Sequence, residues 1–254
     1  MSTKTKIALV TGGSRGLGKN IALTLAKKGI DVILTYHSNK SEADKVVSEI
    51  QSYGRNGLAM QLDTRKVDTF DTFIQQVSKY LEEKNGSSKF DFLINNAGTG
   101  LILPASQTVE KQLDELLDIH YKGVFFLIQK SLPAMNDGGS IINLSSGLTR
   151  TTMTPAPVYA SMKGAIEVLT RYLAKELGPR KIRVNAIAPG AIETDFDGGM
   201  VRDNGVTNER IASATALGRV GLPDDIGKVA AFLCSEDSDW VTGERIEVSG
   251  GQGL

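Results

Sequence analysis

The sequence has 254 residues, of which 41% are hydrophobic and 23% are charged, a composition typical of a folded globular protein rather than of a disordered chain. The 29 basic residues equal the 29 acidic ones, and this zero net charge argues against a nucleic-acid-binding protein, which needs a basic excess. Cys234 is the only cysteine, so an internal disulfide is excluded and no metal cluster is spelled out.

The N-terminal stretch MSTKTKIALVTGG carries no apolar run of the length found in signal peptides. No other stretch approaches the roughly 18 consecutive apolar residues of a membrane span. We therefore expect a cytoplasmic protein without a membrane or nucleic-acid partner. Cys234 lies in the apolar run AAFLCSE and is expected in the core.

Seven short apolar runs, separated by amphipathic segments, predict alternating strands and helices. The strands are expected at 6–12, 31–36, 56–63, 90–98, 139–146, 182–190 and 245–251, and the helices at 17–28, 41–53, 67–84, 108–135, 157–177 and 224–235. The strand runs are apolar almost throughout, as in strands buried on both faces of a parallel sheet. We therefore predict one α/β domain over residues 1–254, with a doubly wound, seven-stranded parallel sheet of the Rossmann type.

A glycine-rich turn joins the first strand to the first helix. Gly12, Gly16 and Gly18 are spaced as a dinucleotide-binding turn requires, because the backbone must reverse sharply, approach a pyrophosphate and pack a helix against a strand. The helix N-terminus then offers free N–H groups to the phosphates. The alternative is a tight turn without a ligand. The candidate cofactor contacts along the turn are Gly12, Ser14, Arg15, Gly16, Leu17 and Gly18.

The end of the second strand indicates which dinucleotide is bound. NAD-selective folds usually place Asp or Glu there to hold the ribose 2′-hydroxyl, whereas this chain has Tyr36, His37 and Ser38. Arg15 lies in the glycine turn, and a guanidinium binds phosphate in a forked geometry. We therefore predict NADP(H) rather than NAD(H), with Tyr36, His37 and Ser38 as further cofactor contacts; as plain loop residues, they would face solvent.

Tyr159 and Lys163 are the candidate proton-transfer pair. Their i, i+4 spacing in the predicted helix 157–177 puts them on one face. A nearby ammonium favours the phenolate, so we expect Lys163 to lower the pKa of Tyr159 and allow proton exchange with a carbinol oxygen. Ser145 and Ser146 end the fifth strand, where a hydroxyl can hold the substrate oxygen. Alone, this four-residue spacing is common by chance.

Two irregular segments are expected to shape a substrate pocket. The polar stretch 191–216 follows the sixth strand and is predicted to be a lid, the alternative being a surface loop. The loop 147–157 carries Leu148, Thr149, Arg150, Met153 and Pro155. Arg150 is expected to face water rather than an anionic substrate.

Several motifs, in order along the chain, resemble the short-chain dehydrogenase/reductase family. They are TGGSRGLG (11–18), Asp63 after the third strand, NNAG (95–98), the serines ending the fifth strand, YASMK (159–163), PGAIET (189–194) and RVGLPDDIG…WVTGERIEVSGG (219–251). The last stretch especially resembles 3-oxoacyl-[acyl-carrier-protein] reductase-like members. The match spans essentially the whole chain.

The resemblance implies roles for the matching residues. Tyr159 matches the general acid/base, Lys163 the residue that lowers its pKa and holds the nicotinamide ribose, and Ser146 the serine that orients the substrate. Ser145 is the less favoured serine. The implied cofactor contacts are Asp63 and Thr64 at the adenine, Asn95, Ala97 and Gly98 on the adenosine-ribose side, and Pro189, Gly190, Ile192 and Thr194 at the nicotinamide end. Purely structural roles, such as ending a strand or capping a helix, are the alternative for these residues.

His120 departs from the family pattern. The family usually carries a catalytic asparagine in a segment like N-x-x-G-x-F, which here reads His120-Tyr121-Lys122-Gly123-Val124-Phe125. The family asparagine helps hold a water that links the lysine to solvent. His120, counted here among the catalytic candidates, either supports this relay in altered form, replaces the asparagine structurally, or leaves the relay impaired.

The leading hypothesis is an oxidoreductase that transfers a hydride between NADP(H) and a carbonyl or alcohol by a Tyr-Lys-Ser mechanism. A 3-oxoacyl thioester is one expected substrate, beside sugars, steroids and simple ketones. The alternative is an NADP-binding protein of the same fold with weak or no catalysis, because of His120. The resemblance also implies a homotetramer that packs the helices at 108–135 and 157–177 and contacts near the C-terminal strand.

Overall fold

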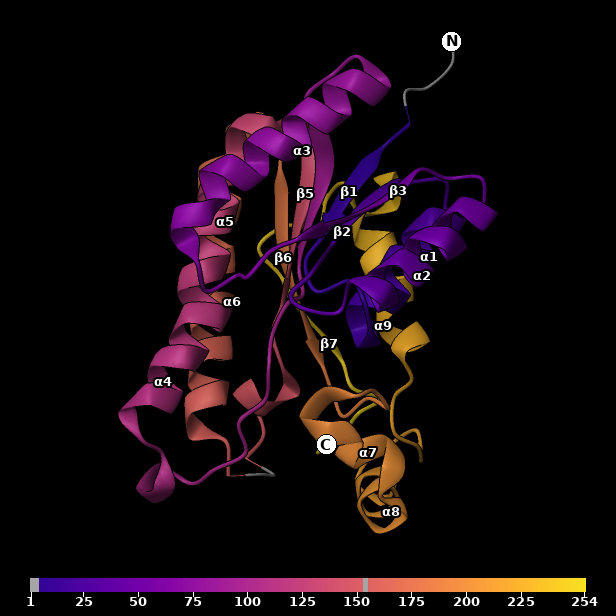
Figure 1. The fold of residues 1–254 in the computed structure, drawn as a ribbon. Coiled ribbons are helices and arrows are strands. Elements are labelled where there is room, and N and C mark those ends of the chain that lie inside the picture. The colour runs from indigo at the N-terminus through magenta and orange to yellow at the C-terminus, as the bar shows by residue number, and fades with distance from the viewer. Residues whose placement is uncertain (1–4, 153–154) are drawn as a thin grey trace.

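Seven short strands form one parallel sheet in the computed structural model, which describes residues 5–152 and 155–254. Their order is β3-β2-β1-β4-β5-β6-β7, and each neighbouring pair is parallel (Figure 1). The bounds are β1 (Ile7–Val10), β2 (Asp31–Tyr36), β3 (Gly57–Gln61), β4 (Phe90–Asn95), β5 (Met135–Leu144), β6 (Arg183–Pro189) and β7 (Arg245–Val248). The predicted seven-stranded, doubly wound sheet is thus confirmed.

Helices cover both faces of the sheet, as Figure 1 shows. One face carries α1 (Gly16–Lys27), α2 (Lys40–Ser52) and α9 (Pro223–Leu233), and the other carries α3 (Phe70–Asn85), α5 (Gly123–Ser131) and α6 (Pro157–Leu177). A separate hydrophobic core lies between the sheet and each helical layer. Strands such as β1 and β4 are therefore buried on both faces, which explains their nearly continuous apolar sequence.

The predicted helix at 108–135 is interrupted, which corrects that prediction. It comprises α4 (Glu110–Leu117), a π-helical turn at Asp118–Lys122 that contains His120, and α5. Beside the π turn, a Cβ on Gly123 would lie 2.1 Å from the Thr64 carbonyl oxygen, so only glycine allows this approach. β5 begins at Met135, before the predicted start at residue 139, because it runs through the polar, glycine-containing stretch Asn136–Gly139.

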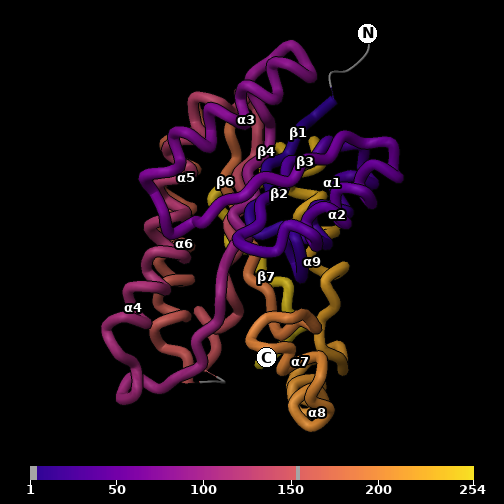
Figure 2. Tube along the Cα trace, viewed as in Figure 1, coloured from indigo at the N-terminus to yellow at the C-terminus, as the bar shows by residue number. Residues whose placement is uncertain are grey.

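The sheet brings its functional segments to one edge. The chain winds outward in opposite directions from β1 and β4, and ligands of such sheets bind beyond the carboxyl ends of the strands at this point. The short helices α7 (Met200–Asp203) and α8 (Gly205–Ser213) lie beyond the same ends (Figure 2). Met153, expected to shape a pocket, lies outside the described residues. Across the described ranges, no helix has both the length and the apolar character needed to span a membrane.

Candidate active site

Helix α6 places Tyr159 and Lys163 side by side against the carboxyl end of β5. Pro157 begins the helix, where its missing N–H costs nothing. Both side chains are buried, with Tyr159 8% and Lys163 5% exposed. The Lys163 Nζ donates a 2.7 Å hydrogen bond to the Leu144 carbonyl oxygen and lies 5.6 Å from the centre of the Tyr159 ring. The two side chains therefore lie together, as their spacing predicts, and the lysine is anchored to the sheet.

Burial dominates the electrostatics of this pair. It raises the pKa of Tyr159 to about 12, although a hydrogen bond with Ser146 acts in the opposite direction. Burial also lowers the pKa of Lys163 to about 7. The expectation that Lys163 lowers the pKa of Tyr159 is therefore not met. The Lys163 Nζ bonds to Leu144, and burial keeps Tyr159 a protonated donor at neutral pH.

Of the two serines after β5, only Ser146 faces the tyrosine. The Ser146 Oγ accepts a 3.2 Å bond from Leu148 N at the start of a 3₁₀ turn and is hydrogen-bonded to the Tyr159 side chain. The Ser145 Oγ turns away and donates a 2.6 Å bond to Glu167 on α6. The geometry thus favours Ser146 over Ser145 as the substrate-orienting hydroxyl.

His120 lies beside this pair, on the π turn between α4 and α5. Its Nε2 is 2.7 Å from the Thr99 carbonyl oxygen, and its ring packs edge-on against the Tyr159 ring with centres 5.2 Å apart. Burial and the positive charge of Lys163 hold the pKa of His120 well below 6.5, so the ring is neutral. The bond to Thr99 requires the proton on Nε2, which leaves Nδ1 as an acceptor.

The Nδ1 atom of His120 is buried and has no hydrogen-bond partner within the described chain. It lies over Gly98, where a Cβ would be 2.6 Å from His120 Cε1 and 3.2 Å from Nδ1. Gly98 is therefore required to be small by the histidine rather than by the turn alone. An unpaired buried acceptor is costly, and a buried water is its ordinary partner.

The glycine turn has the shape of a dinucleotide cradle. Gly12 and Gly16 have positive φ values of 65° and 55°, and a Cβ on Gly18 would lie 2.2 Å from the Gly12 carbonyl oxygen. The neighbouring Asn96 Nδ2 supports the turn by donating to the Thr11 and Gly12 carbonyl oxygens at 2.9 and 3.2 Å. Within the described chain, no side chain caps α1, so its N-terminal N–H groups point into this cradle. Arg15 is exposed at the N-cap, while Ser14 and Leu17 are half-buried.

Charged residues gather beyond β2 and β3, next to the glycine turn. Arg65 binds both carboxylate oxygens of Asp63, with Nε–Oδ1 2.9 Å and Nη2–Oδ2 2.8 Å. This pairing lowers the pKa of Asp63 to about 2. The Nη2 of Arg65 also lies 3.2 Å from His37 Nε2. The sequence analysis missed Arg65, because a single arginine in a polar loop gives no signal until its partners are known.

The other predicted cofactor residues divide into exposed and buried sets. Ser38 is exposed and Thr64 half-buried, whereas Tyr36 is buried. Asn95 is turned into the sheet, where its Nδ2 donates to Asn143 Oδ1 at 2.9 Å. The Ala97 N–H donates to the Thr11 hydroxyl at 3.0 Å, which ties the NNAG segment to the glycine turn.

The segment after β6 closes the other side of the site. Gly190 packs on Ser249, where a Cβ would be 2.9 Å from Ser249 Cα, and Ile192 pairs with Gly221. Thr194 is buried and faces the glycine turn, since a Cβ on Gly16 would lie 3.7 Å from Thr194 Cβ. Pro189, the last residue of β6, is also buried. These residues therefore meet Gly16 across the carboxyl edge of the sheet.

An apolar wall continues outward from Tyr159. Leu101, Ile102 and Leu148 pack against the small buried cluster that contains Tyr159. The Phe196 ring lies 6.0 Å from the Tyr159 ring and remains 44% exposed. A Cβ on Gly100 would lie only 3.0 Å from Phe196 Cε1. Phe196 belongs to the predicted lid but was not singled out, because its contact with Gly100 joins segments far apart in sequence. Arg150 is exposed, as expected, and pairs with Glu247 at 3.2 Å.

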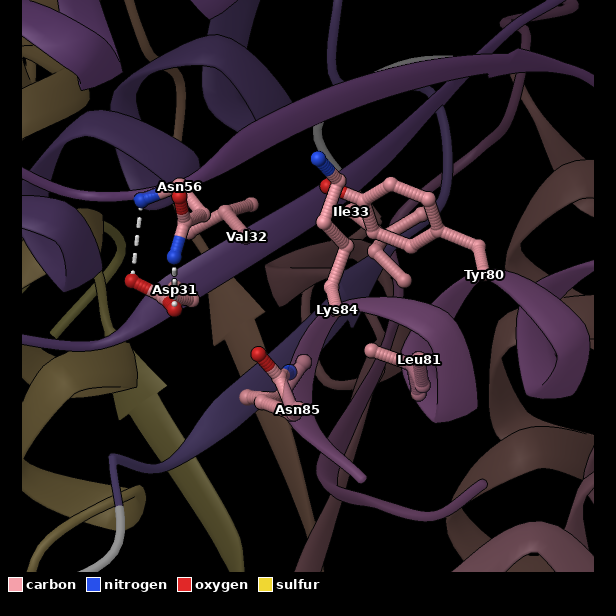
Figure 3. Close-up of a pocket in the computed structure, with 9 residues that line it drawn as sticks. Asp31, Val32, Ile33, Asn56, Tyr80, Leu81, Lys84 and Asn85 are labelled. Atoms are coloured by element: carbon pink, nitrogen blue, oxygen red, sulfur yellow. Dashed lines mark hydrogen bonds between the residues drawn. The ribbon is translucent and has the colours of Figure 1, made fainter. Parts of the chain in front are cut away.

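A small pocket at the opposite edge of the sheet is unrelated to these residues. Figure 3 shows Asp31 at the start of β2, with its carboxylate bonded to the backbone and side-chain nitrogens of Asn56 at 2.9 and 2.8 Å. Tyr80 and Lys84 of α3 complete the lining. Asp31 thus links the start of β2 to the residue that precedes β3. Across residues 5–152 and 155–254, no group of three or more His, Cys, Asp or Glu side chains is arranged to hold a metal ion.

Comparisons with known proteins agree with this arrangement. The sequence profile of the family described as Enoyl-(Acyl carrier protein) reductase, of the short-chain dehydrogenase/reductase type, matches residues 12–252. An uncharacterised oxidoreductase of Methylorubrum extorquens is 37% identical over 246 residues, or 97% of each chain. The hydroxynaphthalene reductase-like protein Arp2 of Metarhizium brunneum is 36% identical over 97% of this chain and 94% of its own.

Solved structures with the same fold include two ketoreductases. The reductase LugOII, described as catalysing keto-reduction at C1 during lugdunomycin biosynthesis, superposes with a TM-score of 0.93 at 36% identity and covers 100% of both chains. The landomycin C-6 ketoreductase LanV, with bound NADP and rabelomycin, has a TM-score of 0.89 at 33% identity, covering 98% of this chain and 96% of its own.

The buried neutral His120 predicts a measurable pH dependence of stability. Below about pH 6.5 the unfolded chain protonates this histidine while the folded chain does not, so the free energy of unfolding falls as the pH falls. The His120→Asn variant lacks the titrating imidazole and therefore this pH-dependent loss of stability. Between about pH 7 and 5.5, urea unfolding should therefore show the wild type losing about 1 kcal/mol more than the variant. Equal losses in the two proteins would contradict a neutral His120.

Proposed function

The chain belongs to the short-chain dehydrogenase/reductase family, and from this premise we propose that it is an NADP(H)-dependent oxidoreductase acting on a carbonyl or its alcohol. The observation that carries the proposal is the buried Tyr159 hydroxyl, hydrogen-bonded to Ser146 beside the anchored Lys163. A buried phenol with a serine partner on one side and a lysine on the other can pass a proton to a substrate oxygen.

The glycine turn is the proposed pyrophosphate site. The close approach of Gly18 to Gly12 and the uncapped N-terminus of α1 fit a dinucleotide within the described structure. Asp63, Thr64, Asn95, Ala97 and Gly98 would hold the adenosine half. The nicotinamide half would lie against Tyr159, Lys163 and the residues at the end of β6 and just after it, which are Pro189, Gly190, Ile192 and Thr194.

The choice of NADP(H) over NAD(H) rests on charge. Asp63 is neutralised by Arg65, and Arg15 is an exposed arginine in the glycine turn. His37 and Ser38 stand at the end of β2, where an NAD-selective fold would carry a carboxylate. LanV was crystallised with NADP, which supports the same choice.

The catalytic roles follow from the contacts. NADPH, when bound, supplies the hydride for reduction of the carbonyl carbon. Ser146 would hold the carbonyl oxygen, and the protonated Tyr159 hydroxyl would donate its proton to that oxygen. Lys163, whose pKa is lowered to about 7, exchanges protons readily at neutral pH and holds its place through Leu144. In the oxidative direction Tyr159 would accept the proton.

His120 is the proposed relay-supporting residue. Its Nε2 bonds to Thr99, and its buried Nδ1 is an acceptor beside Tyr159 and the charge of Lys163. These contacts support both a structural replacement of the family asparagine and an altered relay that runs through Nδ1. They weigh against the alternative of a cofactor-binding protein whose catalysis is impaired by His120.

The proposed substrate is a ketone carried on a flat aromatic body. Phe196, Leu148 and Leu101 form an apolar wall beside Tyr159, and an exposed aromatic ring suits stacking. The names of Arp2 and LanV, a hydroxynaphthalene reductase-like protein and an angucycline ketoreductase, point the same way. A 3-oxoacyl thioester, expected from the sequence, is the second candidate.

A lid, a homotetramer and a cytoplasmic location complete the proposal. The lid is the segment 191–216, within a single domain over 1–254. Exposed apolar side chains on the outer faces of α4 and α6 support a tetramer packed through these helices; they are Val109, Leu113, Val168 and Tyr172. Cys234 is free and buried, as expected of a core residue.

The proton donor is tested by Tyr159→Phe. This variant keeps the ring that packs against His120 and loses the hydroxyl, so kcat should fall by roughly 10²–10⁴-fold. NADPH binding, followed by the fluorescence of the reduced nicotinamide, should stay within a few-fold of the wild type. Undiminished turnover of a ketone by this variant would refute the role of Tyr159.

Substrate class is tested by a carbonyl panel with the Phe196→Ala variant beside the wild type. We expect flat polycyclic aromatic ketones to be reduced best, and the variant to lose about 3–10-fold in kcat/KM for them, the value of one aromatic pair. Flexible aliphatic ketones should be unaffected and serve as the control. Preferred turnover of a 3-oxoacyl thioester would instead favour the second candidate.

A further inference from the structure

A cluster of charged residues contacts the segment that carries Ser146. Arg245 and Glu247 come from β7, Glu167 from α6, and Arg150 from the loop after β5. The central pair is largely buried, with side-chain exposures of 15% for Arg245 and 13% for Glu167. Two opposite charges withdrawn from water in this way need specific partners.

The Glu167 carboxylate holds the segment that carries Ser146 from both sides. Its Oε1 accepts bonds from the Ser145 Oγ at 2.6 Å and from the Thr149 Oγ1 at 2.8 Å. The same oxygen accepts the Arg245 Nε at 2.6 Å. One carboxylate thus fixes a residue before Ser146 and a residue after it.

Arg245 holds the backbone of Ser146 itself. Its Nη2 donates to the Ser146 carbonyl oxygen at 3.3 Å and to the Thr149 Oγ1 at 3.1 Å. Its Nη1 donates to Glu247 Oε2 at 2.8 Å, so the guanidinium is oriented from a third direction. A forked donor of this kind sets both position and angle.

The other bonds of Ser146 lie within its own turn or reach Tyr159. Its Oγ accepts from the Leu148 N–H and bonds to the Tyr159 side chain, and its carbonyl oxygen accepts from the Thr149 N–H and Oγ1. The Ser145 N–H, which donates to the Ile187 carbonyl oxygen at 2.7 Å, ties the start of the segment to β6. The location of this hydroxyl relative to Tyr159 therefore depends on where the backbone from Ser145 to Thr149 is held. Glu167 and Arg245 are the charged groups that hold it, from α6 and from β7.

We propose that the Glu167–Arg245 ion pair is a positioning unit for the reaction, which aligns the Ser146 hydroxyl with Tyr159 by clamping residues 145–149 between α6 and β7. Neither residue touches the reacting atoms, so both are positioning residues. This inference rests on the proposed function, because it assigns the pair to the serine of that reaction.

The test is a double-mutant cycle between Glu167→Ala and Ser146→Ala, assayed with a ketone substrate and NADPH. Misplacing a catalytic group by about 1 Å costs roughly 100-fold, so Glu167→Ala should lower kcat by roughly 10–100-fold. The dissociation constant for NADPH should stay within about twofold. Because Glu167 acts through Ser146, the double variant should be no slower than Ser146→Ala alone.

Conservative variants separate positioning from folding. The amide oxygen of Glu167→Gln still accepts from Ser145 and Thr149, so this variant should recover most of the activity lost in Glu167→Ala. Arg245→Lys keeps the positive charge but loses the forked hydrogen-bond donor, and it should lower kcat only when Ser146 is present. This variant replaces Glu167→Ala in the cycle if Glu167→Ala does not fold. Glu83→Ala, at an exposed position of α3 away from the helices proposed for the tetramer, is the matched control and should leave kcat unchanged.

Two results would overturn the inference. The first is an equal loss of kcat from Glu167→Ala, or from Arg245→Lys, whether Ser146 is present or replaced. The second is a parallel loss of NADPH affinity, as expected of general damage to the fold. Unchanged turnover in Ser146→Ala would remove the serine role and this inference with it, while the Tyr159→Phe result tests the reaction independently.

Discussion

The 2.7 Å hydrogen bond from Lys163 Nζ to the Leu144 carbonyl oxygen is the contact on which the rest of the site depends. It joins α6 to the carboxyl end of β5 and so sets the height of the helix against the sheet. Tyr159 lies one turn before Lys163 and Glu167 one turn after it, so this height decides whether both reach the Ser145–Thr149 segment. Burying an ammonium is costly, and the lowered pKa of Lys163 reflects that cost.

A second constraint comes from the π turn between α4 and α5. The extra residue in this turn directs His120 inward, where its Nε2 bonds to Thr99 and its ring packs against Tyr159. The segment after β4 is thereby linked to Tyr159 through His120. Gly98 of this segment must remain small because it lies beneath the histidine ring. The histidine therefore has a defined structural reason to replace an asparagine, whatever it adds to proton transfer.

Much of this arrangement could be predicted from the sequence, and the remainder could not for physical reasons. The strand 31–36 and the helix 157–177 match β2 and α6 because their apolar periodicity is uninterrupted. The start of β5 was missed because Asn136–Gly139, where the pairing with β4 shifts register, has no apolar pattern. The π turn was missed because one inserted residue hardly disturbs helical periodicity. Phe196 and Arg245 acquire meaning only from partners distant in sequence, and Arg65 only once its contact with His37 is known. The pKa of Tyr159 depends on burial that a four-residue spacing does not report.

In the reaction proposed for this chain, a hydride passes from NADPH to a carbonyl carbon while the side chains of Tyr159, Lys163 and Ser146 handle the proton. The most direct measurement is the reduction of a ketone by the wild-type protein with NADPH deuterated at the transferable C4 position, followed by mass spectrometry and NMR of the product. We expect one deuterium on the carbinol carbon, and none there when unlabelled NADPH is used in D₂O. Product that carries solvent deuterium at that carbon, or none from NADPH, would contradict the proposed reaction.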